Sequence, residues 1–143
     1  VVAGVFAERG VRALVFRGHD GLDELSTAGP STVFVVRDGT ATQVTFDPAD
    51  LGIPRARPED LRGGDPDYNA NVVREVLAGK PGPVRDAVLL NAAAALVAYD
   101  GPGDDLTADL QRAYVRAAQA VDSGRAAATL DRWIELSRAL KNS

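Results

Sequence analysis

The residues with the clearest chemical potential are two adjacent carboxylates, Asp23 and Glu24, at the end of a polar loop that follows an apolar run. In open α/β sheets, ligands bind beyond the carboxyl ends of the strands, so a polar loop with glycines is an expected site there. Neighbouring carboxylates repel each other unless something neutralises them. Mg²⁺ suits this task because it takes one or two carboxylates together with phosphate oxygens and water. The alternative is structural, with Asp23 capping a turn and Glu24 in solvent.

Three other side chains allow a chemical or a structural interpretation. His19, in the same loop, could act as a base or ligand, but a single loop histidine more often makes a local hydrogen bond. Asn91 interrupts an otherwise apolar helix, so its amide needs partners inside the protein, and we expect it to anchor a neighbouring loop. Trp133 lies on the apolar side of a helix and is expected in the core rather than at a ligand.

Composition excludes several kinds of site. The 143 residues include one histidine and no cysteine, which excludes a thiol nucleophile, a disulfide framework and a thiolate zinc site. The 16 basic residues are scattered and outnumbered by 20 acidic ones, which argues against a nucleic-acid partner. No run approaches the ~20 apolar residues that span a bilayer, and no signal peptide is evident. We therefore expect a cytoplasmic protein with no membrane partner.

The elements that must position the carboxylate pair are predicted from apolar patterning. Residues 13–16 (ALVF) form a continuous apolar run, which predicts a strand at 11–16 that is buried on both faces inside a sheet. Asp38-Gly39, flanked by the segments 32–37 and 40–46, predicts a two-residue hairpin at an antiparallel edge. Residues 87–98 are apolar nearly all round, which is typical of a helix buried in the middle of the structure.

Together these patterns predict an α/β fold. Its sheet is expected to be mixed and mostly parallel, with an antiparallel edge hairpin and helices on both faces. Amphipathic helices are expected at 66–78, 106–121 and 125–140. The chain has no methionine, and it begins with an apolar helical segment that lacks a capping residue. We therefore expect residues 1–143 to be a single α/β domain from the C-terminal part of a longer protein.

Several segments then resemble, in order, the C-terminal half of the bacterial anthranilate phosphoribosyltransferases. The resemblance spans nearly the whole chain and is carried by residues 19–26 (HDGLDELS), 45–48 (TFDP), 63–65 (GGD) with Asn69, and 82–93 (GPVRDAVLLNAA). Members of this family act in tryptophan biosynthesis, where they transfer phosphoribosyl from phosphoribosyl diphosphate (PRPP) to anthranilate and release diphosphate.

The resemblance implies a fold, substrates and a metal site. The fold is the C-terminal α/β domain of a nucleoside phosphorylase/phosphoribosyltransferase-like architecture, in a homodimeric enzyme. Asp23 and Glu24 match the family's Asp-Glu pair, which coordinates Mg²⁺ beside the diphosphate. PRPP or diphosphate and anthranilate are the implied partners of the intact enzyme.

Other parts of the family pattern are absent from this sequence. These are the diphosphate loop Gly-Thr-Gly-Gly-Asp, the segment Lys-His-Gly-Asn-Arg and the arginine that holds the anthranilate carboxylate. Gly63-Gly64-Asp65 follows Arg62 rather than Gly-Thr, so we expect it to cap a helix. The isolated chain is therefore expected to be inactive. Two alternatives are a noncatalytic binding or accessory module of the same fold and a pyrimidine nucleoside phosphorylase-like relative, which residues 19–26 disfavour.

Overall fold

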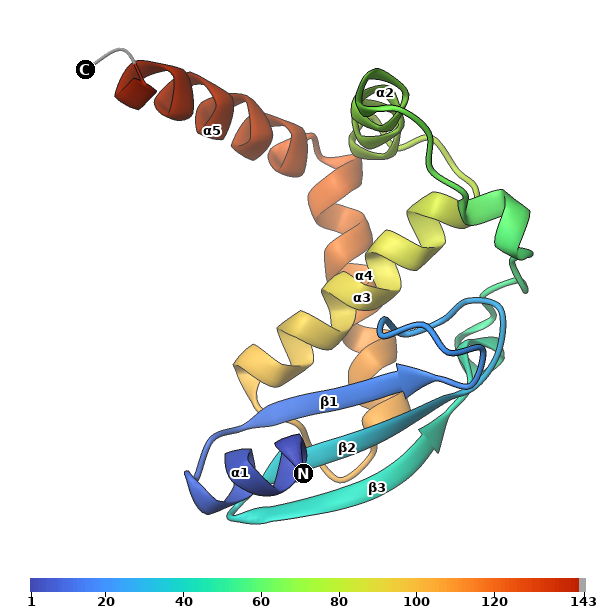
Figure 1. Cartoon of the computed structure of the whole chain (residues 1–143), viewed down its shortest axis with the longest axis vertical. Helices are drawn as coiled ribbons and strands as arrows, with labels where there is room; N and C mark the ends of the chain where they lie inside the picture. Colours follow the sequence, from blue (N-terminus) through green and yellow to red (C-terminus); the bar gives the residue numbers. More distant parts are fainter. Residues whose placement is uncertain (142–143) are drawn as a thin grey trace.

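A three-stranded sheet lies at one end of the molecule. The computed structural model describes residues 1–141 and places β1 (Ala13–Gly18), β2 (Ser31–Arg37) and β3 (Thr40–Phe46) in sequence order across the sheet. Both neighbouring pairs are antiparallel, with Gly18 opposite Ser31 at one end of the first pair. Figure 1 shows the sheet below the long helices, with α1 (Val2–Glu8) beside it.

The sheet differs from the predicted one in two respects. Within residues 1–141 every strand pair is antiparallel, so the mostly parallel arrangement is not confirmed. In addition, β1 is an edge strand and β2 is central, whereas the strand at 11–16 was expected inside the sheet. The physical reason is that an apolar run reports burial on both faces of a strand, and an antiparallel edge strand can also be covered on both faces.

Helices cover both faces of the sheet, as predicted. Along β1, Leu14 and Phe16 pack into the main core with residues of α3 (Pro83–Asp100) and α4 (Leu106–Asp122). The alternate residues, Ala13 and Val15, pack against α1 on the opposite face. This alternation follows from the two-residue period of a strand, and it places α1 on one face and the α3–α4 pair on the other.

The Asp38-Gly39 hairpin is confirmed. Asp38 and Gly39 join β2 to β3 with φ angles of 50° and 73°. Two consecutive positive φ angles are what a type I′ turn requires, and its twist matches that of the flanking strands. Arg37 and Thr40 are paired directly across the turn.

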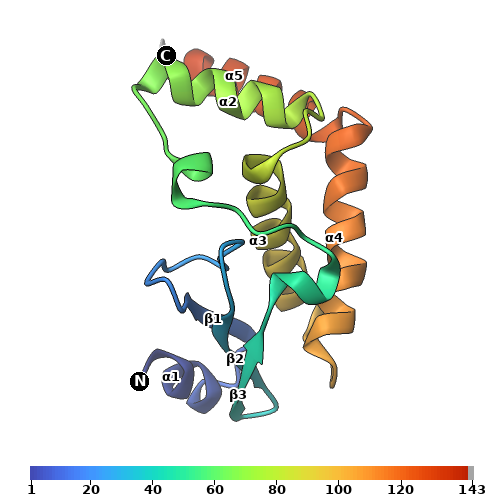
Figure 2. The same ribbon diagram turned by 90° about the vertical axis from the view of Figure 1, so that its right-hand side faces the viewer.

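The helical half of the molecule rises from the sheet (Figure 2). The chain passes from β3 through two short 3₁₀ turns, η1 (Pro48–Leu51) and η2 (Pro58–Leu61), to α2 (Pro66–Leu77), and α5 (Arg125–Lys141) ends the described chain. Asp65 caps α2 by accepting a 2.8 Å hydrogen bond from the Tyr68 amide. The structure therefore confirms that residues 63–65 belong to a helix cap.

α3 and α4 form the most extensive helix–helix contact. Leu90 and Ala93 of α3 and Leu110 of α4 are fully or almost fully buried between them. At the other end of the pair, the Tyr114 phenol donates a 3.1 Å hydrogen bond to Asp86, and Arg85 forms an ion pair with Asp122 at 2.7 Å. The expected central position of α3 is confirmed, although Val88 remains 44% exposed.

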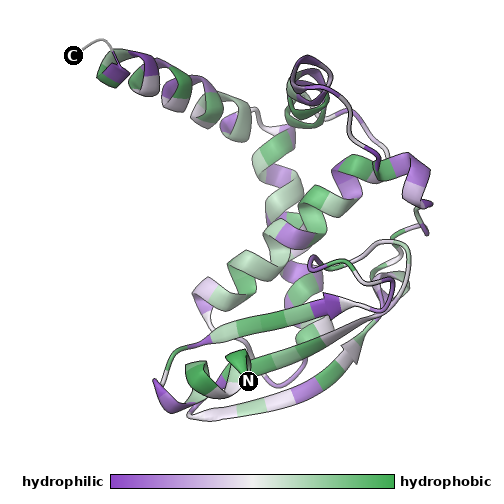
Figure 3. Cartoon of the chain, viewed as in Figure 1, coloured by the Kyte–Doolittle hydropathy of each residue, from purple (hydrophilic) through white to green (hydrophobic). Residues whose placement is uncertain are grey.

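The expectation that Trp133 lies in the core is wrong for this chain. α5 leaves the end of α4 and points away from the sheet, so Trp133 is 69% exposed and Leu140 66% exposed (Figure 1). Figure 3 shows apolar and polar segments alternating along α5, while β1, β2 and α3 are mainly apolar. Among the described residues, no helix is long and apolar enough to cross a membrane.

Candidate functional site

Asp23 and Glu24 lie in the loop that connects β1 to β2, residues 19–30. Both side chains are exposed. Within residues 1–141, neither carboxylate takes part in a hydrogen bond or an ion pair, in contrast to most other acidic residues of the loop regions. The capping interpretation of Asp23 is therefore not supported by any hydrogen bond, and both carboxylates are available to bind a ligand.

The backbone just before the pair is fixed by Asp20. One Asp20 carboxylate oxygen accepts a 3.1 Å hydrogen bond from the Leu22 amide, and the other accepts a short one from the Ser26 hydroxyl. The Leu22 carbonyl in turn accepts a 2.8 Å bond from the Gly18 amide at the end of β1. The signal for this role of Asp20 in the sequence is its position in a turn, where an aspartate side chain commonly accepts a hydrogen bond from the amide two residues later.

The backbone just after the pair is fixed by Asn91 of α3. The Leu25 amide donates to the Asn91 side-chain oxygen, and the Asn91 side-chain nitrogen donates to the Leu25 carbonyl, both at 3.0 Å. The same nitrogen donates a second 3.0 Å bond to the Ala87 carbonyl one turn earlier in α3. The predicted role of Asn91 as a loop anchor is therefore confirmed.

Asp23 and Glu24 therefore form a two-residue segment, called here the carboxylate bridge, between two fixed points of the backbone. Leu22 is held to β1, and Leu25, which is only 2% exposed, is held to α3 and buried in the main core. Asp23 and Glu24 span the gap, and their side chains form no hydrogen bond with the part of the chain that the structure describes. A rigid frame with free carboxylates is the arrangement expected of a binding loop supported by a scaffold.

The donor set of this bridge fits a magnesium ion that is completed by a ligand rather than enclosed by protein. No group of three or more His, Cys, Asp or Glu residues capable of holding a metal is found in the described part of the chain. Mg²⁺ commonly keeps several waters and uses only one or two carboxylates plus substrate phosphates. Asp23 and Glu24 provide that number of carboxylates, so the residues present suit Mg²⁺ together with a phosphate ligand.

A hollow of about 410 Å³ lies beside the bridge. Its walls come from the loop, from Leu61 of η2 and from the first half of α3, and they include Glu24, Thr27 and Asn91. Thr27 is only 1% exposed, and its hydroxyl has no hydrogen-bond partner among residues 1–141. Thr27 could not be selected from the sequence, because a threonine in a loop carries no signal that its hydroxyl is buried.

His19 has a local structural role, as expected. Its Nε2 lies 3.1 Å from the Thr32 hydroxyl of β2, and its amide donates a 2.9 Å bond to the Pro30 carbonyl. These contacts close the base of the loop against the strand that follows. Gly63-Gly64-Asp65 is not part of the carboxylate bridge and belongs to the α2 cap described above.

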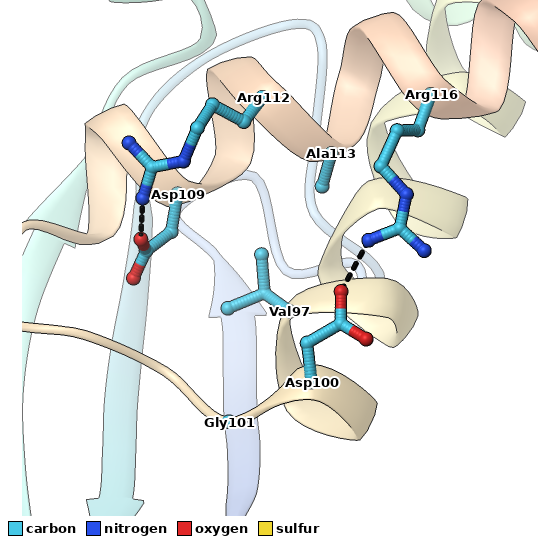
Figure 4. A pocket seen from close by; sticks show the side chains of 7 residues that line it. All are labelled: Val97, Asp100, Gly101, Asp109, Arg112, Ala113 and Arg116. Carbon is cyan, nitrogen blue, oxygen red and sulfur yellow. Dashed lines mark hydrogen bonds and ion pairs between the residues drawn. The ribbon is translucent and has the colours of Figure 1, made fainter.

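A second polar hollow, of about 250 Å³, lies between the end of α3 and the first half of α4 (Figure 4). Its charged groups face one another in pairs: Asp100 with Arg116, and Asp109 with Arg112. Asp109 also accepts a 2.6 Å bond from the Gly103 amide. Because each carboxylate already has a cationic partner, this hollow offers no free charge to a ligand, and the Asp23-Glu24 bridge is the better candidate.

The chain is similar in sequence to proteins of a known family. Residues 1–127 match the model of the glycosyl transferase family, a/b domain. The chain is 64% identical over 139 residues to anthranilate phosphoribosyltransferase from Thermobifida fusca, covering 97% of this chain and 40% of that relative. It is 58% identical over 139 residues to anthranilate phosphoribosyltransferase from an Arthrobacter species, with coverage of 96% and 40%. The chain thus spans about 40% of the length of the curated relatives it matches.

Solved structures agree in fold. Anthranilate phosphoribosyltransferase from Thermus thermophilus superposes with a TM-score of 0.74 at 34% identity, over 90% of this chain and 36% of that one. The Saccharomyces cerevisiae protein in complex with PRPP and Mg superposes with a TM-score of 0.77 at 25% identity, over 87% and 34%. Since the family model covers most of the chain and the fold agrees, this chain belongs to the glycosyl transferase family, a/b domain.

Proposed function

We propose that residues 1–143 are the C-terminal α/β domain of an anthranilate phosphoribosyltransferase, and that Asp23 and Glu24 hold Mg²⁺ beside the diphosphate of PRPP. The observation that carries the proposal is the carboxylate bridge itself, which is exposed, fixed at both ends and without an ion pair or side-chain hydrogen bond to any described residue. The 64% identity to the Thermobifida fusca anthranilate phosphoribosyltransferase supports it. The Saccharomyces cerevisiae structure with PRPP and Mg supports the ligand class.

The reaction is a displacement at the anomeric carbon of ribose. The amine of anthranilate is already a neutral nucleophile, so the demand for acid–base catalysis is modest, and positioning matters more. Bound Mg²⁺ would neutralise the negative charge that grows on the departing diphosphate. The part played by this chain is to present two carboxylates from a fixed backbone. The groups that hold the phosphates and the anthranilate carboxylate have no counterpart among these 143 residues.

We extend the proposal to the setting of the protein on the basis of the family resemblance. We place it in tryptophan biosynthesis in the cytoplasm, as part of a homodimer, with PRPP and anthranilate as substrates and without nucleic-acid or membrane partners. A Saccharomyces cerevisiae structure in complex with 4-fluoroanthranilate, superposing with a TM-score of 0.78, supports the acceptor class.

The test compares Asp23→Asn and Glu24→Gln with the unchanged protein in a chain of the relatives' full length that carries residues 1–143, called here the full-length form. We expect each substitution to lower kcat by about 100-fold or more, because removing a group that stabilises developing charge typically costs this much. We expect little change in Tm, because both side chains are exposed. Near-normal turnover in both variants would contradict the proposal. A full-length form that binds PRPP without transferring it would favour a noncatalytic module.

A further inference from the structure

We propose that Asn91 is a positioning residue for the magnesium site, because it sets the position of Glu24 relative to α3. This inference rests on the proposed role of Asp23 and Glu24. Asn91 reaches Leu25 across 66 positions of sequence and contacts the loop at the residue directly after Glu24. It does not touch the carboxylates themselves.

The side chain of Asn91 matches the backbone of Leu25 group for group. A side-chain amide carries an acceptor and a donor, and so does a peptide unit, so the two form a pair of hydrogen bonds. Both bonds measure 3.0 Å. Only glutamine offers the same groups, and its additional methylene would push the loop away from the helix.

Asn91 is also fixed on its own helix. The second hydrogen of its side-chain nitrogen is donated to the Ala87 carbonyl at 3.0 Å. The amide therefore uses its acceptor and both of its donors, which leaves one orientation of the side chain. A side chain held in this way fixes the position of Leu25 relative to α3. α3 is itself anchored in the core by Leu90 and Ala93, both 0% exposed.

No other hydrogen bond in the described chain links the loop to α3, although the Leu25 side chain also packs in the main core. Asp20 and Gly18 fix the chain at Leu22, before the carboxylates, and Ser26 bonds to Ser31 and Asp20 after them. All of these partners belong to the loop or to its flanking strands, so they set the internal shape of the loop. Asn91 is the residue that connects the loop backbone to α3 by hydrogen bonds in the described chain, and so it determines where the bridge sits over the hollow lined by Glu24 and α3.

Three substitutions in the full-length form test the proposal. Asn91→Ala removes the pair of bonds. Asn91→Asp keeps the volume and the acceptor for the Leu25 amide, but it places an oxygen opposite the Leu25 carbonyl. Asn69→Ala is the matched control, because Asn69 makes the same type of paired bonds, at 3.0 and 2.9 Å, to Gly64 in the α2 cap.

The first readout is independent of catalysis. Hydrogen–deuterium exchange of the peptide that covers residues 19–27 should become about 10-fold to 100-fold faster in Asn91→Ala, since the Leu25 amide loses its acceptor. It should stay unchanged in Asn69→Ala. The second readout is the Mg²⁺ concentration that gives half-maximal turnover. We expect it to rise about tenfold or more in both Asn91 variants, with the KM for anthranilate unchanged and with no such rise in Asn69→Ala.

Each outcome decides the question. Unchanged exchange in the Asn91 variants overturns the proposal, and so does faster exchange with an unchanged Mg²⁺ requirement, because Asn91 would then be merely structural. If Asn91→Ala fails to fold, Asn91→Asp is judged by the same criteria, because repulsion between its carboxylate and the Leu25 carbonyl should also make the loop exchange faster. Failure of the proposed function looks different: Asp23→Asn and Glu24→Gln would leave the Mg²⁺ requirement unchanged, whereas the Asn91 variants would still loosen the loop.

Discussion

The phenol of Tyr114 on α4 donates a hydrogen bond of 3.1 Å to the carboxylate of Asp86, in the first turn of α3. Burial of the phenol, together with the neighbouring Asp86 charge, raises the pKa of Tyr114 to about 12. The contact joins the two helices that form the main core, and α3 also carries the loop anchor. Removing the hydrogen bond between Tyr114 and Asp86 therefore tests how much this contact stabilises the packing of α3 against α4.

Tyr114→Phe should lower the free energy of unfolding of the full-length form by about 1–2 kcal/mol at neutral pH, because Asp86 loses a donor. The pKa of the phenol is higher in the folded protein than in the unfolded chain, so folding favours the neutral form. Its contribution to stability is therefore complete below pH ~10 and is lost as the pH rises through about 12. Urea unfolding at pH 7 to 11 should show the difference between the two proteins shrinking above pH 10. Tyr99→Phe, at a position 82% exposed, is the control, and an equal effect there would contradict the assignment.

Residues 1–143 alone should show no transfer of phosphoribosyl to anthranilate. The chain spans about 40% of the length of its relatives and lacks the motifs that position both substrates. Positioning contributes a large part of catalysis, and two carboxylates cannot replace it. The measurement is anthranilate consumption with PRPP and Mg²⁺, alongside the full-length form as a positive control. Turnover by a preparation whose mass matches 15.0 kDa would refute the prediction.

Asp23 and Glu24 should bind Mg²⁺ appreciably only when diphosphate or PRPP is present. Two exposed carboxylates leave most of the ion's octahedron to water, and Mg²⁺ gives up its water reluctantly. Isothermal titration of the full-length form with MgCl₂ should give measurable heat in the presence of diphosphate and little in its absence. The double variant of Asp23→Asn with Glu24→Gln provides the baseline. Tight binding of Mg²⁺ without any phosphate ligand would show that the protein supplies more donors than the bridge contains.

Gly18→Ala should disturb the carboxylate bridge by breaking the hydrogen bonds of Asp20 that fix the backbone just before it. A β-carbon at Gly18 would overlap the Asp20 carboxylate and lie 3.2 Å from the Ser26 β-carbon, so Asp20 would have to leave Leu22 and Ser26. We expect a loss of about 1–2 kcal/mol in the free energy of unfolding and faster hydrogen exchange at residues 19–27. Gly29→Ala is the control within the same loop, because a β-carbon there meets no atom within 4 Å. Equal effects of the two substitutions would contradict the steric explanation.

Local chemistry made parts of the fold predictable from the sequence. Asp38-Gly39 fixes a turn because both residues tolerate positive φ, and Asp65-Pro66 starts α2 because a carboxylate cap and a proline suit the first turn. The edge position of β1 and the exposure of Trp133 were not predictable. Both depend on which surfaces the rest of the protein brings into contact, and an apolar residue has the same local pattern whether or not its partner is present.

The candidate site was predictable to a similar extent. The adjacency of Asp23 and Glu24, with their position after a strand, was sufficient to select them. The sequence does not predict which loop Asn91 anchors, because its hydrogen bonds to Leu25 join residues 66 positions apart. The buried hydroxyl of Thr27 was missed for the same reason, since only tertiary packing buries it.

The outer edge of β1 has a consequence for how the isolated chain behaves in solution. In the described residues β1 pairs only with β2, so its other edge, along Leu14, Val15 and Phe16, has no strand partner, although the Gly18 amide and carbonyl bond to the loop. Its one charged side chain is Arg17, which gives little protection. A long apolar edge of this kind is a template for intermolecular strand pairing. Residues 1–143 produced alone are therefore expected to form β-rich aggregates at high concentration, and preparations of them will require dilute conditions.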